Sequence, residues 1–332
     1  MESQILDVDL LRFERGGERE RRGVIDGVMR SLTTGFVYAS SDLPEDLLDE
    51  TYGLLRRFFC LPEAVKQSYS LPDCGGQTGY TAPLREQAVG SDLADWKEML
   101  NWSLPLPASH PLRRRFPLLY PEQLLPEAAV PGISVVLDRF HRQLAELQRR
   151  VLRIIALGMG CAESYFDTVV RDAPTLTRAL HYPPMAEAPR SGHLWAAPHG
   201  DINLITALPR ATAPGLQVLV EGNWIAAAPP EGRVILNTGL MLERLSNGRI
   251  PAGWHRVVAG EEQVGGRLSV VQFCHPTPWT VLAPVSSCCG PADPPRWPGL
   301  LAADALEEVL HQLGLTGSTA GEPQPAERQT GR

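Results

Sequence analysis

Short apolar or alternating runs, separated by Gly, Pro and Asn, fill the chain from residue 178 to residue 273 and restrict its fold more than any other feature. Alternation with a period of two places one set of side chains on each face of a strand. Many short strands at this spacing are typical of an antiparallel sandwich or barrel. The predicted strands cover residues 178–182, 203–208, 215–220, 224–227, 233–237, 255–258 and 267–273.

A long helix is predicted immediately before these strands. Between residues 133 and 158, apolar side chains recur with the 3.6-residue period of a helix. They are Leu137, Phe140, Leu144, Leu147, Val151, Ile154 and Ile155. We expect this helix to support the sheet region along its whole length.

The remaining segments are less regular. The elements predicted before residue 133 are strands at 5–11 and 35–38, helices at 18–31, 43–61 and 63–68, and an irregular connection over 72–132. A closing helix is predicted at 300–313. These features divide the chain into an amino-terminal helical and irregular region (1–132), a strand-rich core with its supporting and closing helices (133–313) and a disordered tail (314–332).

Composition narrows the classes of partner and the location. The chain has 332 residues, and its 31 basic against 38 acidic side chains give a formal charge of −7, so nucleic acid is not expected as a partner. No secretory leader or apolar run of the ~20 residues that cross a bilayer is found. Six scattered cysteines without a Cys-x-x-Cys pair are read as reduced thiols. We therefore expect a cytoplasmic protein, and no obligate protein partner is evident from the sequence.

The sequence offers one candidate metal site. On a strand, His199 and Asp201 would point to the same face, and His255 on a later strand would add a second imidazole. Two histidines and a carboxylate form the facial triad of non-haem Fe(II) oxygenases, which leaves coordination positions open. A His-x-acid tripeptide is expected about once by chance in such a chain, and a lone histidine is more often structural.

A second pair of residues suits an anion. Arg267 and Ser269 are two residues apart on a predicted strand and share one face. A guanidinium fork beside a hydroxyl can hold a carboxylate end-on in a dry pocket.

Ordered sequence motifs extend these two signals over most of the chain. In the carboxyl-terminal half they are HGDINLITAL at 199–208, GLQV at 215–218, LSNGR at 245–249, WHRVV at 254–258 and RLS at 267–269. In the amino-terminal half they are GFVY at 35–38, RFFCLP at 57–62, Lys66, Gly79-Tyr80 and Lys97-Glu98. Together, over about residues 4 to 315, the chain resembles the isopenicillin N synthase-like family of non-haem Fe(II), 2-oxoglutarate-dependent oxygenases.

The resemblance implies a fold and a set of ligands. The fold would be mixed α+β, with a double-stranded β-helix (jelly roll, cupin-like) core, an amino-terminal helical region and a long supporting helix. His199, Asp201 and His255 match the family's iron ligands. The residues that match the 2-oxoglutarate site are Arg267 and Ser269, which bind its distal carboxylate, and Tyr182, which assists them. The chain departs from the family pattern at Gly200, where Thr or Glu is common, and at Leu240, where an acidic residue is usual.

The implied activity is oxidation of an unactivated C–H bond with Fe(II), 2-oxoglutarate and O2. Hydroxylation is the expected outcome, with desaturation or cyclisation as alternatives, on a small metabolite of a bacterial biosynthetic pathway. Two other functions remain open: an oxidase like isopenicillin N synthase, which uses O2 without 2-oxoglutarate, and a non-catalytic binder on the same jelly roll. The candidate substrate-lining residues are Arg85, Trp96, Gln272, His275 and Trp279.

Overall fold

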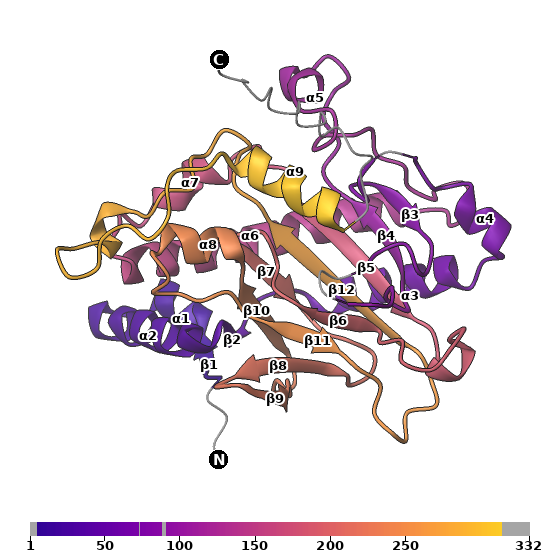
Figure 1. The fold of residues 1–332 in the computed structure, drawn as a ribbon, viewed down its shortest axis with the longest axis horizontal. Coiled ribbons are helices and arrows are strands. Elements are labelled where there is room, and N and C mark those ends of the chain that lie inside the picture. The colour runs from indigo at the N-terminus through magenta and orange to yellow at the C-terminus, as the bar shows by residue number, and fades with distance from the viewer. Residues whose placement is uncertain (1–4, 73, 88–90, 314–332) are drawn as a thin grey trace, which may run out of the picture.

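Two β-sheets face each other at the centre of the computed structural model, which describes residues 5–72, 74–87 and 91–313 (Figure 1). The larger sheet has the strand order β1-β2-β10-β7-β12-β5-β4-β3, and the smaller has the order β6-β11-β8-β9. The strands are β1 (Asp7–Asp9), β2 (Phe36–Ser40), β3 (Gly79–Thr81), β4 (Glu98–Trp102), β5 (Leu176–Tyr182), β6 (Ala196–His199), β7 (Ile205–Leu208), β8 (Leu216–Val220), β9 (Asn223–Ala226), β10 (Arg233–Thr238), β11 (His255–Val257) and β12 (Arg267–Cys274). Only the β1 and β2 pair is parallel among the described strands.

Helices surround the sheets. They are α1 (Leu10–Arg15), α2 (Glu18–Ser31), α3 (Glu45–Phe59), α4 (Glu63–Gln67), α5 (Pro111–Arg115), α6 (Ile133–Gly158), α7 (Tyr165–Val169), α8 (Leu240–Leu245) and α9 (Ala302–Gln312). The prediction of a mixed α+β fold is confirmed. None of the helices in the described ranges has the length and apolar character that crossing a membrane requires.

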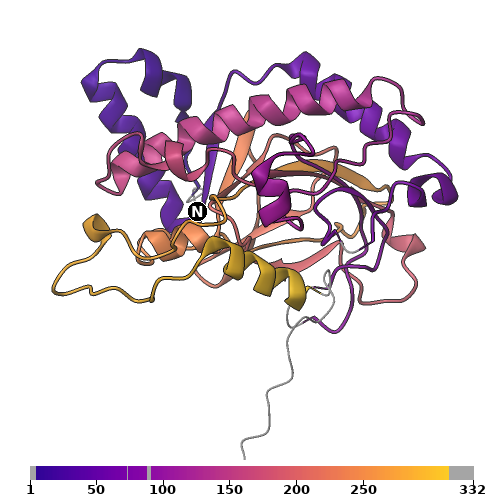
Figure 2. The same cartoon turned by 90° about the horizontal axis from the view of Figure 1, so that it is seen from above.

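The long helix α6 supports the larger sheet, as the sequence predicts. Its apolar side chains at helical spacing are buried, among them Leu137, Leu144 and Val151, and it packs against β7 and β12. Full burial of each such side chain contributes about 1.5–3 kcal/mol to folding. Figure 2 shows α6 on one side of the sheets and α9 on the other, so only one face of the larger sheet is covered by the spine helix.

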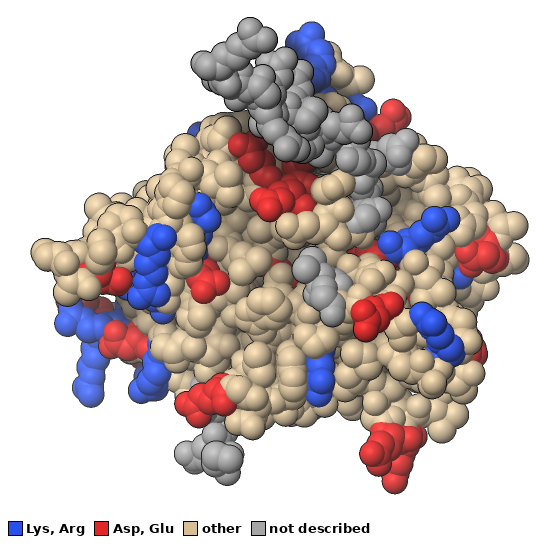
Figure 3. Space-filling view, in the orientation of Figure 1, with Lys and Arg blue, Asp and Glu red and all other residues tan. Residues whose placement is uncertain are grey.

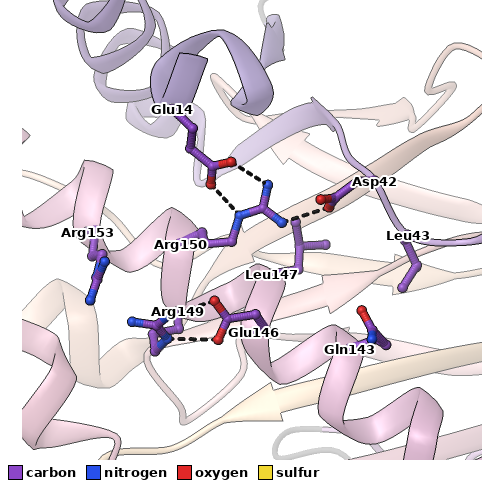
Figure 4. Close-up of a pocket in the computed structure, with 9 residues that line it drawn as sticks. All are labelled: Glu14, Asp42, Leu43, Gln143, Glu146, Leu147, Arg149, Arg150 and Arg153. Carbon is purple, nitrogen blue, oxygen red and sulfur yellow. Dashed lines mark hydrogen bonds and ion pairs between the residues drawn. The ribbon is translucent and has the colours of Figure 1, made fainter. Parts of the chain in front are cut away.

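The outer face of α6 is tied to the amino-terminal segments by charge. Arg150 forms a two-pronged ion pair with Glu14 of α1, and its Nη1 lies 2.7 Å from a carboxylate oxygen of Asp42, which follows β2 (Figure 4). These ion pairs hold two early segments of the chain on the helix.

Several sequence predictions need correction. The predicted irregular connection at 72–132 contains β3 and β4, which extend the larger sheet. The polar residues of β4 obscured its strand character, although all five of its residues are buried. The predicted first strand, 5–11, ends early because the carboxylate of Asp9 accepts hydrogen bonds from two backbone N–H groups of the first turn of α1. Helix α8 and strand β6 were not predicted. The predicted disordered tail lies outside the described residues.

Candidate active site

A cavity of about 370 Å³ lies between the two sheets. Both sheets contribute to its wall, and α9 lies across it with Leu306, Val309 and Leu310 turned inward. The outer face of α9 carries the exposed acidic residues Asp304, Glu307 and Glu308, and acidic side chains gather over this helix in Figure 3. The helix therefore presents an apolar face to the cavity and a charged face to solvent.

His199, Asp201 and His255 meet in this cavity. His199 ends β6 and His255 begins β11, and the two residues are directly paired in the smaller sheet. Their imidazole ring centroids are 4.3 Å apart. One candidate ligand atom from each histidine and one from Asp201 all lie within 4.8 Å of one another. Residues far apart in the chain therefore form one compact donor set.

The reason given from sequence for the His199 and Asp201 pair is wrong. Strand β6 ends at His199, so Asp201 does not share a strand face with it. Instead, the Asp201 carboxylate oxygen Oδ2 accepts hydrogen bonds from the Thr206 hydroxyl at 2.5 Å and the Asn237 amide at 2.8 Å. The backbone carbonyl of Asp201 also accepts from the N–H of Leu240 at 2.8 Å. Contacts from β7, β10 and α8 thus hold the carboxylate beside the two imidazoles.

Backbone carbonyls orient both histidines. Nδ1 of His199 is 2.7 Å from the carbonyl oxygen of Ala197, and Nδ1 of His255 is 2.9 Å from that of Gly253. Because a carbonyl oxygen only accepts, each Nδ1 must carry the proton, which leaves the Nε2 lone pair free for a metal.

Electrostatics keep the donors in the protonation states that a metal needs. Burial lowers the pKa of His199 to about 4, and the neighbouring His255 acts in the same direction. Burial raises the pKa of Asp201, but the two histidines and the hydrogen bonds from Thr206 and Asn237 outweigh it, so the net change is downward. At neutral pH the site offers a neutral imidazole and a carboxylate, a donor set that fits Fe(II).

A buried guanidinium occupies another part of the cavity wall. Arg267 donates from Nη1 to the Ser269 hydroxyl at 2.8 Å and from Nε to the backbone carbonyl of Ala213 at 3.1 Å. Its guanidinium carbon lies 5.1 Å from the centroid of the Tyr182 ring. All three side chains are buried and line the cavity. Within the described residues, no carboxylate lies at ion-pairing distance from Arg267, so its charge is available to an anionic ligand.

Of the other residues predicted to line the substrate cavity, the structure places some in the cavity wall and others outside it. His275 is buried and lines the cavity. Arg85 is exposed and is not part of the wall, which its neighbour Glu86 lines instead. Trp96 faces away and donates from Nε1 to the carbonyl of Pro184 at 3.2 Å. Trp279 is 44% exposed and its ring lies near that of Phe116.

Gln272 was assigned to the wrong face of β12. Its amide donates to the carbonyl of His141 at 3.0 Å and to the hydroxyl of Thr177 at 2.8 Å, on the side of α6. The period of two that places Arg267 and Ser269 on the cavity face places Gln272 on the opposite face. The same rule could have excluded it from the sequence.

Sequence reasoning missed a charged part of the wall. Glu86, Asp95, Lys97 and Arg178 are largely buried and line the cavity together. One signal was present: the chain has only two lysines, Lys66 and Lys97. Both prove to be buried in ion pairs with carboxylates.

Comparison with known proteins gives matches along most of the chain. Residues 173–276 match the model of the 2OG-Fe(II) oxygenase superfamily, and residues 8–127 match the amino-terminal model of non-haem dioxygenases in morphine synthesis. The chain is 27% identical over 303 residues to azadirone synthase LFS of Melia azedarach, covering 87% of this chain and 88% of that one. It is 25% identical over 313 residues to a leucoanthocyanidin dioxygenase of Perilla frutescens, covering 92% and 82%.

Solved structures agree with these matches. A full-length Neurospora crassa protein in complex with α-KG (2-oxoglutarate) superposes with a TM-score of 0.81 at 25% identity, covering 94% of this chain and 97% of that one. A 2OG-Fe(II) oxygenase family protein from Caulobacter crescentus gives a TM-score of 0.81 at 29% identity, covering 93% and 98%. These likenesses confirm the predicted jelly-roll core with its helical surroundings.

Proposed function

The chain belongs to the isopenicillin N synthase-like family of non-haem Fe(II), 2-oxoglutarate-dependent oxygenases, and from this premise we propose that it hydroxylates a C–H bond of a small organic metabolite. The predictions that it is an enzyme and that it uses Fe(II), 2-oxoglutarate and O2 are confirmed. The reaction type, the substrate and the roles of individual residues are the proposal.

We assign the iron to His199, Asp201 and His255. When bound, Fe(II) supplies oxidation of a substrate C–H bond coupled to the conversion of 2-oxoglutarate and O2 to succinate and CO2. The protein's part would be to present two Nε2 atoms and one carboxylate oxygen to the metal at the cavity wall. The hydrogen bonds to both Nδ1 atoms and to Asp201 fix that arrangement before any ligand binds.

A single observation carries the placement of 2-oxoglutarate: the buried Arg267 has no carboxylate partner in the described chain and faces the same cavity as the triad. The far carboxylate of 2-oxoglutarate would pair with this guanidinium and with the hydroxyl of Ser269. Tyr182 packs its ring beside the guanidinium and limits the positions it can adopt. In this assignment the three residues orient the co-substrate so that its 2-oxo acid end points toward the triad.

The oxidase alternative uses the same residues differently. There Arg267 and Ser269 would hold a carboxylate of the primary substrate, and no succinate would form. The complexes of the Neurospora crassa protein with α-KG favour the 2-oxoglutarate mode for this chain. Direct measurement of succinate separates the two modes.

Substrate identity is limited by the cavity. Its volume of about 370 Å³ must hold the co-substrate and the part of the primary substrate that reacts, so a small molecule or the end of a slender one is favoured. Relatives are described as acting on or binding different compounds, including thymine for the Neurospora crassa protein, so none of them fixes the substrate here. A bacterial biosynthetic pathway, a cytoplasmic location and independence from nucleic acid and protein partners stay predictions of the sequence.

The decisive test follows succinate. Purified protein supplied with Fe(II), 2-oxoglutarate and O2 is expected to release succinate, slowly without a primary substrate and faster with one. His199→Ala and Asp201→Ala should abolish this release and the binding of Fe(II). His193→Ala is the matched control, since His193 is also buried and bonded through Nδ1 to a backbone carbonyl, but lies outside the triad. Fe(II)-dependent succinate release that survives both triad substitutions would refute the assignment.

A further inference from the structure

Four charged side chains line the cavity beside the triad, and the proposed function does not use them. Lys97 Nζ lies 3.0 Å from an oxygen of Glu86 and 2.7 Å from an oxygen of Asp95. Arg178 Nη1 lies 3.0 Å from the other oxygen of Glu86. Two cations and two anions therefore form one continuous, electrically balanced network on the cavity wall.

Such a network is costly for a purely structural wall. Replacing buried ion pairs by well-packed apolar side chains is often neutral or stabilising, because four charges lose hydration when they are buried. The wall nearby is already apolar at Leu176 and Leu180. A charged group retained within an apolar cavity indicates contact with a polar ligand.

The Arg178 guanidinium uses only part of its hydrogen-bonding capacity within the described chain. Its Nε donates to the Asn101 side chain at 2.6 Å, Nη1 to Glu86 and Nη2 to the carbonyl of Gly76 at 3.3 Å. A guanidinium carries five N–H donors, so two have no partner among the described residues. The side chain is 11% exposed, and it is part of the cavity wall. Three fixed contacts hold the guanidinium in place while its free donors remain available to a ligand.

His275 adds a second polar point close by. Its Nδ1 is buried and has no hydrogen-bond partner among the described residues. It lies two residues after Phe273, whose ring centroid is 5.5 Å from the Arg178 guanidinium carbon, and all three line the cavity. This atom has almost no accessible surface, so a ligand in the cavity would meet the part of the imidazole ring that lines the wall.

Apolar side chains line other parts of the same cavity. Leu306, Val309 and Leu310 of α9 line the cavity, and the half-exposed Trp254 lies at its edge beside His255. A Cβ at Gly200 would lie 3.6 Å from the Trp254 ring, an ordinary contact. The glycine therefore leaves part of this ring uncovered. A ligand in the cavity meets a polar corner and an apolar surround.

We infer that Arg178 is a specificity-determining residue that donates hydrogen bonds to a carbonyl or carboxylate oxygen of an otherwise apolar primary substrate, with His275 as a second polar contact. The inference rests on the proposed function, because it places the substrate in the cavity that holds the triad. Glu86, Lys97 and Asp95 act through Arg178, by fixing its guanidinium. Arg267 and Ser269 remain assigned to the co-substrate.

Three matched bicyclic probes test this inference: 1-indanone, indane-1-carboxylate and indane. Their binding is measured by ligand-observed NMR on the full chain loaded with Zn(II), a redox-inert replacement for Fe(II), and 2-oxoglutarate. One oxygen-bearing probe is expected to bind at least about tenfold more tightly than indane, as a hydrogen bond to a charged donor allows. Preference for the indanone identifies a carbonyl as the recognised group, and preference for the indane carboxylate identifies a carboxylate.

Arg178→Met should abolish this preference, and Arg178→Lys, which keeps a positive charge beside Glu86, should retain part of it. Arg150→Met is the matched control, because it breaks ion pairs with two carboxylates outside the cavity. Equal binding of all three probes to the wild type, no binding of the oxygen-bearing probes at millimolar concentration, or an unchanged preference in Arg178→Met would each overturn the inference.

The affinity for 2-oxoglutarate separates this inference from the proposed function. Arg178→Met should bind 2-oxoglutarate with the affinity of the wild type. Its thermal unfolding midpoint should lie above the assay temperature, so that both proteins are folded when they are compared. Where Arg178→Met is too unstable, the double variant Arg178→Met with Glu86→Gln removes one anion together with the cation, which restores the charge balance of the network, and is tested in its place. Failure of the wild type to bind 2-oxoglutarate would count against the proposed function, and the probe preference can still be read without the co-substrate.

Discussion

At the scale of single residues, the candidate metal centre depends on groups that do not touch the metal. Asn237 and Thr206 each donate a hydrogen bond to the Asp201 oxygen Oδ2. Removing one such donor frees the carboxylate to rotate and typically lowers metal affinity about 10- to 100-fold. We expect this loss in Asn237→Leu, measured by Fe(II) titration without oxygen. Asn223→Leu, at an exposed position at the start of β9, serves as the control. A wild-type affinity in Asn237→Leu would show that the carboxylate is held by other contacts.

Arg267 makes a second prediction at this scale. Removing one member of a buried, hydrogen-bonded charge pair costs about 2 kcal/mol or more, which corresponds to about a 30-fold weaker complex. Arg267→Met is therefore expected to raise the dissociation constant of 2-oxoglutarate at least that much, while Fe(II) binding stays unchanged. Equilibrium binding without oxygen measures both. An unchanged constant for 2-oxoglutarate would show that another residue holds its far carboxylate, and Arg267 would then be assigned to the primary substrate.

Single residues also mark how far the sequence could be read. The pairing of two histidines and an aspartate was predictable, because residue types alone define a facial triad. The residues that line the substrate cavity were not predictable, since the sequence does not show which of two neighbouring residues turns its side chain inward. Glu86 lines the cavity where Arg85 was expected, and Lys97 lines it where Trp96 was expected. At Gln272, by contrast, the alternation of the strand was visible in the sequence and contradicted the assignment.

At the scale of elements, α6 joins the amino-terminal segments to the core through Arg150. The side chain is only 16% exposed and pairs with Glu14 and Asp42 (Figure 4). Arg150→Ala is expected to lower the free energy of unfolding by about 1–2 kcal/mol, more than an exposed pair contributes. Arg142→Ala on the same helix removes a side chain that is 60% exposed and paired with Asp138, and it should cost about 0.5 kcal/mol or less. Urea unfolding of both variants measures the difference, and equal losses would show that burial does not strengthen the Arg150 contacts.

Hydrophobic periodicity predicted some helices and strands and missed others. The 3.6-residue period of apolar side chains predicted α6 over its full length, because a strand would place them with a period of two. Strand β4 escaped prediction because Glu98 and Asn101 interrupt its apolar character. In the structure, Glu98 bonds to Lys66, Tyr80 and His181, while Asn101 bonds to Arg178. A buried strand that contains polar residues can be recognised only when the hydrogen-bond and ion-pair partners of those residues are known.

At the scale of the whole molecule, distant pairings build the cavity. Strand β10 pairs with β2, with Asn237 opposite Phe36, and His255 pairs with His199 across the smaller sheet. A single sequence carries no direct record of such registers, since pairing joins segments far apart in the chain. The jelly roll was accessible through resemblance to a family, and its strand order came only with the structure.

Acid stability is the property of the whole molecule that the buried histidines predict. Burial lowers the pKa values of His141, His199 and His275 to about 4 each, against about 6.5 in an unfolded chain. As pH falls below 6.5 the unfolded state takes up protons first, so stability is lost progressively down to about pH 4 and no further from these groups below it. His141 and His275, which are both buried, each contribute at most roughly 3 kcal/mol to this loss, and His199, whose side chain is 36% exposed, contributes less because solvent screens its charge.

His141 allows this loss to be measured away from the cavity. It lies in α6, is bonded to Thr177 at 2.7 Å, and does not belong to the cavity wall. His141→Gln keeps a hydrogen-bonding side chain that does not titrate, so the free energy of unfolding should fall less steeply between pH 6.5 and pH 4.5 than in the wild type. Urea unfolding of the metal-free protein at a series of pH values gives both slopes, whatever the absolute stability of the variant. Parallel slopes would mean that His141 is protonated in the folded core or stays neutral in the unfolded chain, and the acid sensitivity would then have to come from the carboxylate ion pairs instead.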